Sequence, residues 1–467
     1  MKKLLSLLLI LALVFSFVAC NEDGKGENAD KGGNTENEGG NTEEEDNYPP
    51  ATERSLEYTL TGDGTAYLVT GIGTAKGDIV IVKEYNGKPV VAIGDYAFYN
   101  CERLTSVTIP SSITNIGFCA FAWCDSLASI TVEAGNENYK SVDGNLYSKD
   151  GKTLIQYAIG KIDKNFAVPE GVTSIGGHAF FGCDNLTSVA VGNGVTSIGA
   201  SALARCESLA SITVDANNEN YESVDGNLYS KDGKTLIQYA IGKTDKSFAV
   251  PEGVIIIGNS AFCDCKNLAS VTIPDSVTTI GQLSYGNTTV FGNPFAGRTS
   301  LASITVDADN ENYKSIDGNI YSKDGKTLIW YVVGEADKSF TIPEGVTSIG
   351  ESAFDSCDSL VSVTIPNSVT SIGGGAFASC YALVSVTIPD SVTSIDYFTF
   401  AWCKNLVSVT IPNSVTNIDG WSFAYCENLT NINYRGTEAE WQQISKHADW
   451  DSLAGAYTIT HSYTGEQ

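Results

Sequence analysis

The strongest constraint on the fold is a short unit that recurs along the chain. Its frame starts at a phenylalanine, taken as position 0, with cysteine at +3, apolar residues at +6, +9 and +11, proline at +12, and apolar residues again at +15 and +18. The next start usually follows 23 residues later. The ten starts are Phe98, Phe121, Phe180, Leu203, Phe262, Phe295, Phe354, Phe377, Phe400 and Phe423. Stacked copies bury an apolar stripe that one short unit cannot bury alone, so the repeat predicts a solenoid.

Each unit contains two extended segments. In "SVTIP" the β-branched residues alternate with period two and the proline ends the run, which predicts a short strand. A second piece, "VTSI", a glycine turn and a compact "AFxxC" turn complete the unit. Serine and threonine at +8 and +10 predict a hydroxyl ladder that is typical of a solvated sheet. We therefore expect a mainly β repeat protein whose strands pair in parallel at about 4.8 Å per coil.

Three intervals between starts span 59 residues, so each carries 36 additional residues. These inserts are near copies of one another and lie near residues 133–168, 215–250 and 307–342. Each contains an Asp-Gly pair between alternating apolar residues, which predicts a β-hairpin. The aspartates are Asp143, Asp225 and Asp317. We expect each hairpin to leave the solenoid and to rejoin it at the "VPEGVTSIG" segment or its equivalent.

The N-terminus has the pattern of an export signal. Lys2 and Lys3 precede sixteen uncharged residues, 4–19, a run too short for a typical membrane span. Residues 1–19 are therefore predicted to be a signal peptide. The ending "FVAC" resembles a bacterial lipoprotein cleavage box, which implies that Cys20 carries the lipid and holds the chain at a membrane. The alternative is an ordinary signal peptide followed by a chance cysteine.

An acidic segment follows the signal. Residues 21–50 hold ten acids, two lysines and six glycines, with no aliphatic side chain beyond Ala29. Such a composition cannot bury enough apolar surface to offset its chain entropy, so residues 20–50 are predicted to form a disordered acidic tether. The whole chain has a formal net charge of −27, which repels phosphate backbones and disfavours nucleic acid as a partner.

The frame as it stands in "IPNSVTSIGGGAFASCYALVSVTIP", residues 365–389, resembles the BspA-type leucine-rich repeat family. The similarity covers roughly residues 85–434, and "VDGNLYSKDGKTLI" in the inserts is also similar to family segments. It implies a right-handed leucine-rich-repeat solenoid over residues 95–431. "LEYTLTGDGTAYLVTGIG" resembles an entry module, here residues 51–94, and "INYRGTEAEWQQI" resembles a C-terminal cap, here residues 432–467.

The same resemblance implies a function. Members of the family are typically secreted or surface-anchored proteins of host-associated bacteria, so the chain is expected at the cell surface as a non-enzymatic adhesion protein. Its implied partners are host extracellular proteins or other bacterial surfaces, and no cofactor is expected. Two alternatives stay open, a surface glycan-binding or glycan-processing protein and a passive envelope spacer.

Nine cysteines occupy position +3, which raises the question of their chemistry. Like positions in adjacent coils are about 4.8 Å apart, longer than the roughly 3.8 Å Cβ separation of a disulfide. A ladder also spreads thiolates along a line, whereas zinc needs ligands that converge on one point. The pattern therefore favours a buried small hydrophobe, and no metal site is predicted.

Catalytic residues are not predicted either. The chain has three histidines, none of them in a recognisable motif. His178 occupies a variable turn position that is filled elsewhere by Tyr96, Ser260 or Gly375, which favours a location on the surface. Most acids fall in the tether, in turns or in the inserts, where solvation explains them.

The candidate ligand-binding residues are aromatic. Position +2 is usually small or polar, but it is aromatic in three coils, at Trp123, Trp402 and Tyr425. Further aromatic residues in the adjoining turns are Tyr397, Phe398 and Trp421. If the turns stack, those between 397 and 425 gather on one edge of the last coils. Such a cluster suits an interface or a sugar. It could instead cover the solenoid end beneath the cap.

Overall fold

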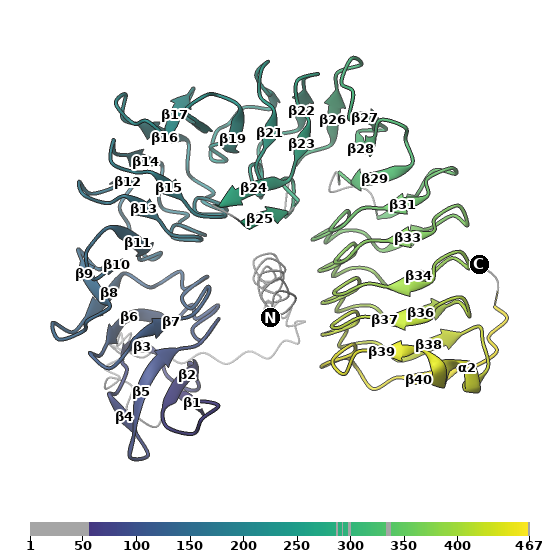
Figure 1. Ribbon diagram of the computed structural model, residues 1–467, viewed down its shortest axis with the longest axis horizontal. Helices are drawn as coiled ribbons and strands as arrows, with labels where there is room; N and C mark the ends of the chain where they lie inside the picture. The colour runs from purple at the N-terminus through teal and green to yellow at the C-terminus, as the bar shows by residue number, and fades with distance from the viewer. Residues whose placement is uncertain (1–55, 286–287, 292, 298–299, 333–337, 466–467) are drawn as a thin grey trace, which may run out of the picture.

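The computed structural model describes residues 56–285, 288–291, 293–297, 300–332 and 338–465. The predicted signal peptide, Cys20 and the acidic tether lie outside the described residues. The described chain is a β-solenoid of about 16 turns with almost no helix. The solenoid curves into an arc, with β1–β16 in one arm and β30–β40 in the other (Figure 1). We call these the N-terminal arm and the C-terminal arm.

The "SVTIP" segments form one row of strands, with the N-terminal β3 at its start. They are β3 (Gly77–Val80), β6 (Leu104–Ile109), β8 (Ser129–Val132), β12 (Asn165–Ala167), β14 (Ser188–Val191), β16 (Ser211–Val214), β20 (Ser247–Ala249), β22 (Ser270–Ile273), β26 (Ser303–Val306), β30 (Ser339–Thr341), β32 (Ser362–Thr364), β34 (Ser385–Thr387), β36 (Ser408–Ile411), β38 (Asn431–Tyr434) and β40 (Thr458–Thr460). Within each of the four sheets of this row, neighbours pair in parallel, and Ser385 lies opposite Ser408, the residue 23 positions later.

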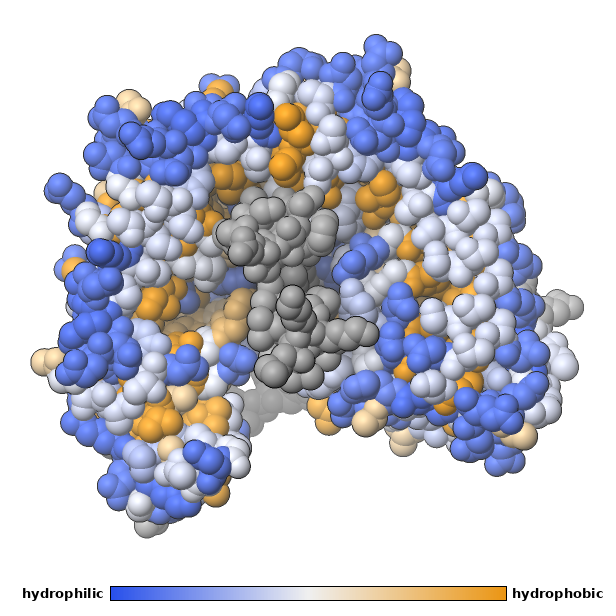
Figure 2. All heavy atoms as spheres, in the orientation of Figure 1, coloured by the Kyte–Doolittle hydropathy of each residue, from blue (hydrophilic) through white to orange (hydrophobic). Residues whose placement is uncertain are grey.

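The "VTSI" segments form a second parallel row. They are β5 (Lys88–Ile93), β7 (Asn115–Ile116), β11 (Thr153–Gln156), β13 (Ser174–Ile175), β15 (Ser197–Ile198), β19 (Thr235–Gln238), β21 (Ile256–Ile257), β23 (Thr279–Ile280), β29 (Thr327–Trp330), β31 (Ser348–Ile349), β33 (Ser371–Ile372), β35 (Ser394–Ile395), β37 (Asn417–Ile418) and β39 (Ser445–Lys446). Both rows expose a polar outer surface, so hydrophilic residues follow the outer rim of the arc (Figure 2).

Phenylalanine rings stack through the core at position 0. In the C-terminal arm the ring centroids of Phe354 and Phe377 are 4.7 Å apart, those of Phe377 and Phe400 are 5.4 Å apart, and those of Phe400 and Phe423 are 5.2 Å apart. All four rings are fully buried. The repeat of one ring per coil therefore gives an unbroken aromatic column, as stacked copies of a short unit require.

Each insert contains the predicted hairpin. The antiparallel pairs are β9 (Tyr139–Val142) with β10 (Asn145–Ser148), β17 (Tyr221–Val224) with β18 (Asn227–Ser230), and β27 (Tyr313–Ile316) with β28 (Asn319–Ser322). A separate pair, β24 (Gln282–Tyr285) with β25 (Thr288–Phe291), fills the shorter insertion before Phe295. The Asp-Gly turns have positive φ at both residues, for example 48° at Asp143 and 73° at Gly144, which suits a tight hairpin.

The expected point of return to the solenoid was wrong, because each insert also contains a degenerate coil. β11 already pairs in parallel with β13, before the "VPEGVTSIG" segment begins. Tyr157 then takes position 0, where its ring centroid lies 5.5 Å from that of Phe180, 23 residues later. Tyr239 and Tyr331 repeat this arrangement in the other inserts. The sequence pattern does not reveal this coil, because tyrosine replaces phenylalanine at position 0 and the cysteine at +3 is missing.

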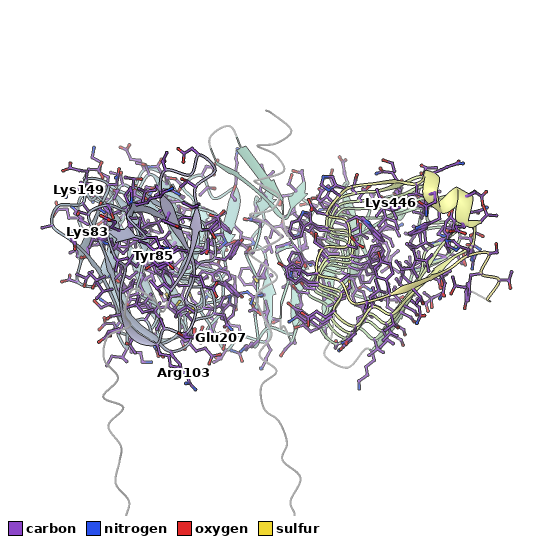
Figure 3. The ribbon with its side chains drawn as sticks, turned by 90° about the horizontal axis from the view of Figure 1, so that it is seen from below. Lys83, Tyr85, Arg103, Lys149, Glu207 and Lys446 are labelled. Atoms are coloured by element: carbon purple, nitrogen blue, oxygen red, sulfur yellow. The ribbon has the colours of Figure 1, made fainter. Side chains whose placement is uncertain are left out.

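The two ends carry different caps. At the N-terminal end, β1 (Glu57–Leu60), β2 (Tyr67–Gly71) and β4 (Glu84–Tyr85) surround a cluster of three tyrosine rings, with Tyr58 stacked on Tyr85 at 4.1 Å. At the other end, the short helix α2 (Glu438–Gln443) places Trp441 over the last coil, and Lys446 lies 4.7 Å from that ring (Figure 3). Among the described residues, no helix is long and apolar enough to cross a membrane.

Candidate binding surface on the inner edge of the arc

The segments around position 0, here called the Phe turns, face the inside of the arc (Figure 1). Burial raises the pKa of Tyr99, and Tyr381 of the opposite arm adds to this shift. The negative charge of Asp358 in the C-terminal arm likewise contributes to the raised pKa of Arg205 in the N-terminal arm. The two arms therefore approach one another at their Phe turns, although these residues are far apart in the sequence.

Two positions of the Phe turn have left-handed backbone conformation. The residue at +2 has positive φ in all ten frame coils, and the residue at −2 has it in nine. Five of the ten +2 residues are glycine, serine or asparagine, which suit or tolerate that region. Aromatic residues at these positions carry a backbone cost. Such outliers point to a compensating role in packing or binding.

Four of these unusual residues form one array in the C-terminal arm. Phe398 and Trp421 occupy −2 in consecutive coils, with φ of 56° and 63°, and Trp402 and Tyr425 occupy +2, with φ of 60° and 58°. The rings of Trp402 and Tyr425 stack at 5.2 Å with 9° between their planes, and those of Phe398 and Trp402 lie 6.0 Å apart at 11°. We call these four rings, together with Tyr397, the aromatic array.

The structure brings five of the six predicted aromatic residues together. Phe398 and Trp402 are buried, whereas Tyr397, Trp421 and Tyr425 are half-buried at the margin of the array. Sequence reasoning missed Tyr381, which belongs to the same cluster and occupies position +4 of the preceding coil. Its signal was an aromatic residue where other coils mostly carry a charged one.

The side chains of the array form a cluster distinct from the core beneath the C-terminal cap. Trp441 and Trp450 of the cap belong to the main core, where the ring of Trp450 meets Phe423 edge-on at 5.8 Å. The aromatic array forms its own cluster at the Phe turns. The cap still adjoins the array through the backbone, because the amides of Trp421 and Tyr425 donate to the carbonyls of Asp449 and Ser452, each at 3.0 Å.

The sixth predicted residue, Trp123, lies in the N-terminal arm. It packs in a cluster around Ala122, Phe181 and Ala204, with its ring edge-on to Phe181 at 5.8 Å. Arg205 completes this cluster, with its guanidinium carbon 5.3 Å from the Trp123 ring and 5.7 Å from the Phe181 ring. The same guanidinium forms a buried ion pair with Asp264, with 2.7 Å between Nε and Oδ2.

His178 is buried, and its predicted surface location was wrong. Its ring lies between Phe118, at 4.8 Å, and Phe181, at 5.3 Å. Burial lowers the pKa of His178 to about 4. The correction has a simple physical reason. A variable turn position is exposed in an isolated coil, but on the inside of a tight arc the turns of successive coils crowd together.

The cysteines of the frame are buried, as predicted, and they also link coils. The thiol of Cys124 donates to the carbonyl of Phe98 at 2.9 Å, and that of Cys403 donates to the carbonyl of Phe377 at 3.1 Å. Cys206, Cys380 and Cys426 make the same bond. All eleven cysteines of the described residues are free thiols. Burial raises the pKa of Cys426, so its thiol stays protonated and unreactive.

The described residues contain no group of three or more histidine, cysteine or carboxylate side chains placed to hold a metal ion. The inner edge instead presents a row of turn positions on a regular solenoid. Aromatic rings occupy these positions in the C-terminal arm, and a mixed polar and aromatic cluster occupies them in the N-terminal arm. Such a solenoid of 23-residue coils defines a leucine-rich-repeat protein.

The chain belongs to the BspA-type leucine-rich repeat family. The profile described as "BspA type Leucine rich repeat region" matches in six copies, over residues 87–153, 159–232, 239–304 and 336–448, which is more than half of the chain. No protein with a curated description matches the chain significantly.

The chain is also similar to several solved structures. A leucine rich cell surface protein from Faecalibacterium prausnitzii is 25% identical, covering 85% of this chain and 97% of its own, with a TM-score of 0.29. A leucine-rich repeat protein from Eubacterium ventriosum is 21% identical, covering 89% and 95%, with a TM-score of 0.38. The pneumococcal vaccine antigen PcpA is 18% identical, covering 88% and 93%, with a TM-score of 0.38. The family assignment rests on the repeat profile, not on these superpositions.

Proposed function

We propose that the chain is a non-enzymatic binding protein of the bacterial surface, which recognises host extracellular proteins or other cell surfaces through the inner edge of its solenoid. The observation that carries the proposal is the aromatic array. Four bulky residues accept a left-handed backbone in two consecutive coils, where the two preceding coils use Ser352, Ser356, Gly375 and Ser379. Aromatic residues concentrate in the energetic centres of protein interfaces.

Family membership supports the same conclusion at a coarser level. BspA-type proteins are generally bacterial surface proteins, and solenoids of this kind typically serve binding rather than catalysis. The lipid anchor on Cys20 and the acidic tether of residues 20–50 complete the proposal, because they would display the solenoid away from the membrane.

A capture experiment tests this function. The purified full chain is offered host matrix proteins, bacterial cells and a panel of glycans, and saturable binding to a protein or cell surface is expected. Binding to glycans alone, or turnover of a glycan, would favour the alternative function. The absence of any binding by the folded chain would leave the role of a passive spacer.

A pair of matched variants locates the surface. Trp421→Ser with Tyr425→Ser removes half-buried rings and places serine where other coils carry it, at Ser352 and Ser356, so the backbone is accommodated. Capture is expected to fall at least tenfold. In the control, Ser385→Ala with Thr387→Ala alters the strand β34 on the sheet side of the same arm. Loss of capture in the control, and not in the aromatic variant, would place the site on the sheet.

A further inference from the structure

A buried amide side chain without a partner lies in the coil that follows the second insert. Among the described residues, neither Oδ1 nor Nδ2 of Asn259 has a hydrogen-bond partner, although Asn259 is only 2% exposed. This side chain lines a small cavity of about 10 Å³, together with Ser201, Leu203 and Gln238. Buried polar groups in folded proteins are nearly always hydrogen-bonded, so this amide needs an explanation.

The cavity lies at a shortened turn of the degenerate coil. Leu236 of this coil pairs with Ile257 of the next coil. Position 0 follows three residues later in the degenerate coil, at Tyr239, and five residues later in the next coil, at Phe262. The Phe turn of the degenerate coil is therefore two residues shorter than that of its neighbour, and it fills less of the space between the coils on either side.

The shortened turn also removes a hydrogen-bond acceptor. In the coil of Phe180, the amide at position 0 donates to the carbonyl of Ala202 in the next Phe turn, at 2.8 Å. Leu203 occupies position 0 in the coil before the shortened turn, and its amide donates no hydrogen bond within the part of the chain that the structure describes. Leu203 is 2% exposed, so this amide has little access to bulk water. A second unsatisfied polar group therefore belongs to a residue that lines the cavity.

The third insert shows how an equivalent amide is satisfied. Phe295 occupies position 0 before the third degenerate coil, and its amide donates to Oδ1 of Asn293 at 2.9 Å. Asn293 is at −2, the position that Ser201 takes in the coil before the second insert. The Ser201 hydroxyl is instead bonded to the hydroxyl of Ser260 across the shortened turn, at 3.0 Å. The amide of Leu203 therefore needs an oxygen atom from another source.

A water molecule has the chemistry that these groups require. The amide of Leu203 and Nδ2 of Asn259 each need an acceptor, whereas Oδ1 of Asn259 needs a donor. An anion only accepts hydrogen bonds and an ammonium ion only donates them, but a water molecule does both. A cavity of about 10 Å³ has room for about one water molecule, and a buried water typically makes about three hydrogen bonds.

We infer that this cavity binds one water molecule as a fixed part of the fold. The water accepts a hydrogen bond from the amide of Leu203 and bridges this amide to the side chain of Asn259. It thereby joins the coils on either side of the shortened turn, as the hydrogen bond between Ser201 and Ser260 also does. This inference goes beyond the proposed function and does not depend on it.

A high-resolution crystal structure of the full chain tests the site directly. One fully occupied water molecule is expected within about 3.2 Å of the Leu203 nitrogen and of a side-chain atom of Asn259. A cavity without density, or an Asn259 side chain that bonds to protein atoms instead, would overturn the inference. Density that refines as an ion would overturn it as well.

Oxygen-17 magnetic relaxation dispersion tests the site in solution, because it counts the water molecules that stay bound for a long time. Asn259→Leu removes the polar atoms at a similar side-chain volume, and it is expected to lose one long-lived water. The control is Glu351→Leu, because Glu351 is exposed at the same turn position after the third insert, and it should lose none. No loss in Asn259→Leu, or an equal loss in both variants, would count against the bound water.

A further variant supplies the oxygen atom from the protein. Ser201→Asn copies the arrangement at Asn293, and asparagine tolerates the φ of 50° at Ser201. The introduced amide oxygen should accept from the amide of Leu203, so one long-lived water is lost while the unfolding temperature is no lower than that of the native chain. Retention of the water beside a Leu203 amide that is bonded to the asparagine would contradict the inference. This variant and the native crystal structure decide the question even if Asn259→Leu fails to fold.

Discussion

The two arms of the arc use the same coil in different ways. In the C-terminal arm, four successive Phe rings form an unbroken column, and β30 to β40 form one six-stranded sheet. In the N-terminal arm, inserts divide the same row into three-stranded sheets, and tyrosine interrupts the Phe column. The inner edge also differs between the arms. It carries stacked aromatic rings in the C-terminal arm and a buried histidine and a buried ion pair in the N-terminal arm. A constant scaffold therefore supports two different surfaces.

The largest expected effect comes from breaking the Phe column. Phe377→Ala removes a fully buried ring between Phe354 and Phe400 and leaves a cavity, at a cost of about 4 kcal/mol. Urea unfolding with hydrogen exchange should show the loss in the C-terminal arm, because coils of a solenoid contact mainly their neighbours. Equal loss of protection in both arms would mean that the arc unfolds as one unit.

The buried ion pair gives the next largest effect, in the N-terminal arm. Arg205→Ala leaves the buried Asp264 without its charge partner, which is expected to cost about 3 kcal/mol in urea unfolding. Lys266→Ala provides the control, since its ion pair with Glu207 is exposed and should contribute less than about 1 kcal/mol. A change of similar size in the two variants would contradict the view that Arg205 organises this cluster.

A pH effect should distinguish the arms further. Burial lowers the pKa of His178 from 6.5 to about 4. Between these two pH values the ring is neutral in the folded chain and protonated in the unfolded chain. The stability due to His178 is therefore present above pH 6.5 and is lost as the pH falls toward 4. Between pH 7 and pH 5 the loss is about 2 kcal/mol.

The control for this pH effect is His178→Asn, because asparagine tolerates the φ of 60° and does not titrate in this range. The pH dependence of the unfolding free energy should flatten in this variant. An unchanged slope would assign the effect to other groups.

The smallest effect concerns the thiol ladder. Cys403→Ala removes the hydrogen bond from the thiol to the carbonyl of Phe377 and a little buried volume, at a cost of about 1 kcal/mol in urea unfolding. Cys206→Ala should cost a similar amount in the N-terminal arm, because its thiol makes the same bond to the carbonyl of Phe180. A much larger loss in only one arm would show that the ladder does not act equally along the arc.

Several features of the fold could be read from the sequence. The period of 23 residues, the buried cysteines, the parallel strands and the hairpins at Asp143 and its equivalents follow from local patterns. The degenerate coil at Tyr157 did not, although tyrosine stands 23 residues before Phe180. Two substituted positions hid it, because Tyr157 stands in place of phenylalanine and Gly160 in place of the +3 cysteine.

The candidate site could be predicted only in part. The unusual aromatic residues at +2 stood out against their equivalents, and the structure places five of the six in one array. Arg205 and Asp264 gave no such signal. Their sequence contexts resemble those of ordinary turn residues, and their importance comes from partners in other coils.

The sequence by itself determined that the chain stacks short β coils, and where the coils begin, because each coil repeats one pattern of apolar spacing that only stacking can bury. The tertiary structure determined which side chains of the Phe turns face one another. Only the curvature of the stack brings Phe turns of both arms to the inside of one arc, where His178 becomes buried and Arg205 meets Asp264. Curvature arises from a small rotation between successive coils, which accumulates along the stack.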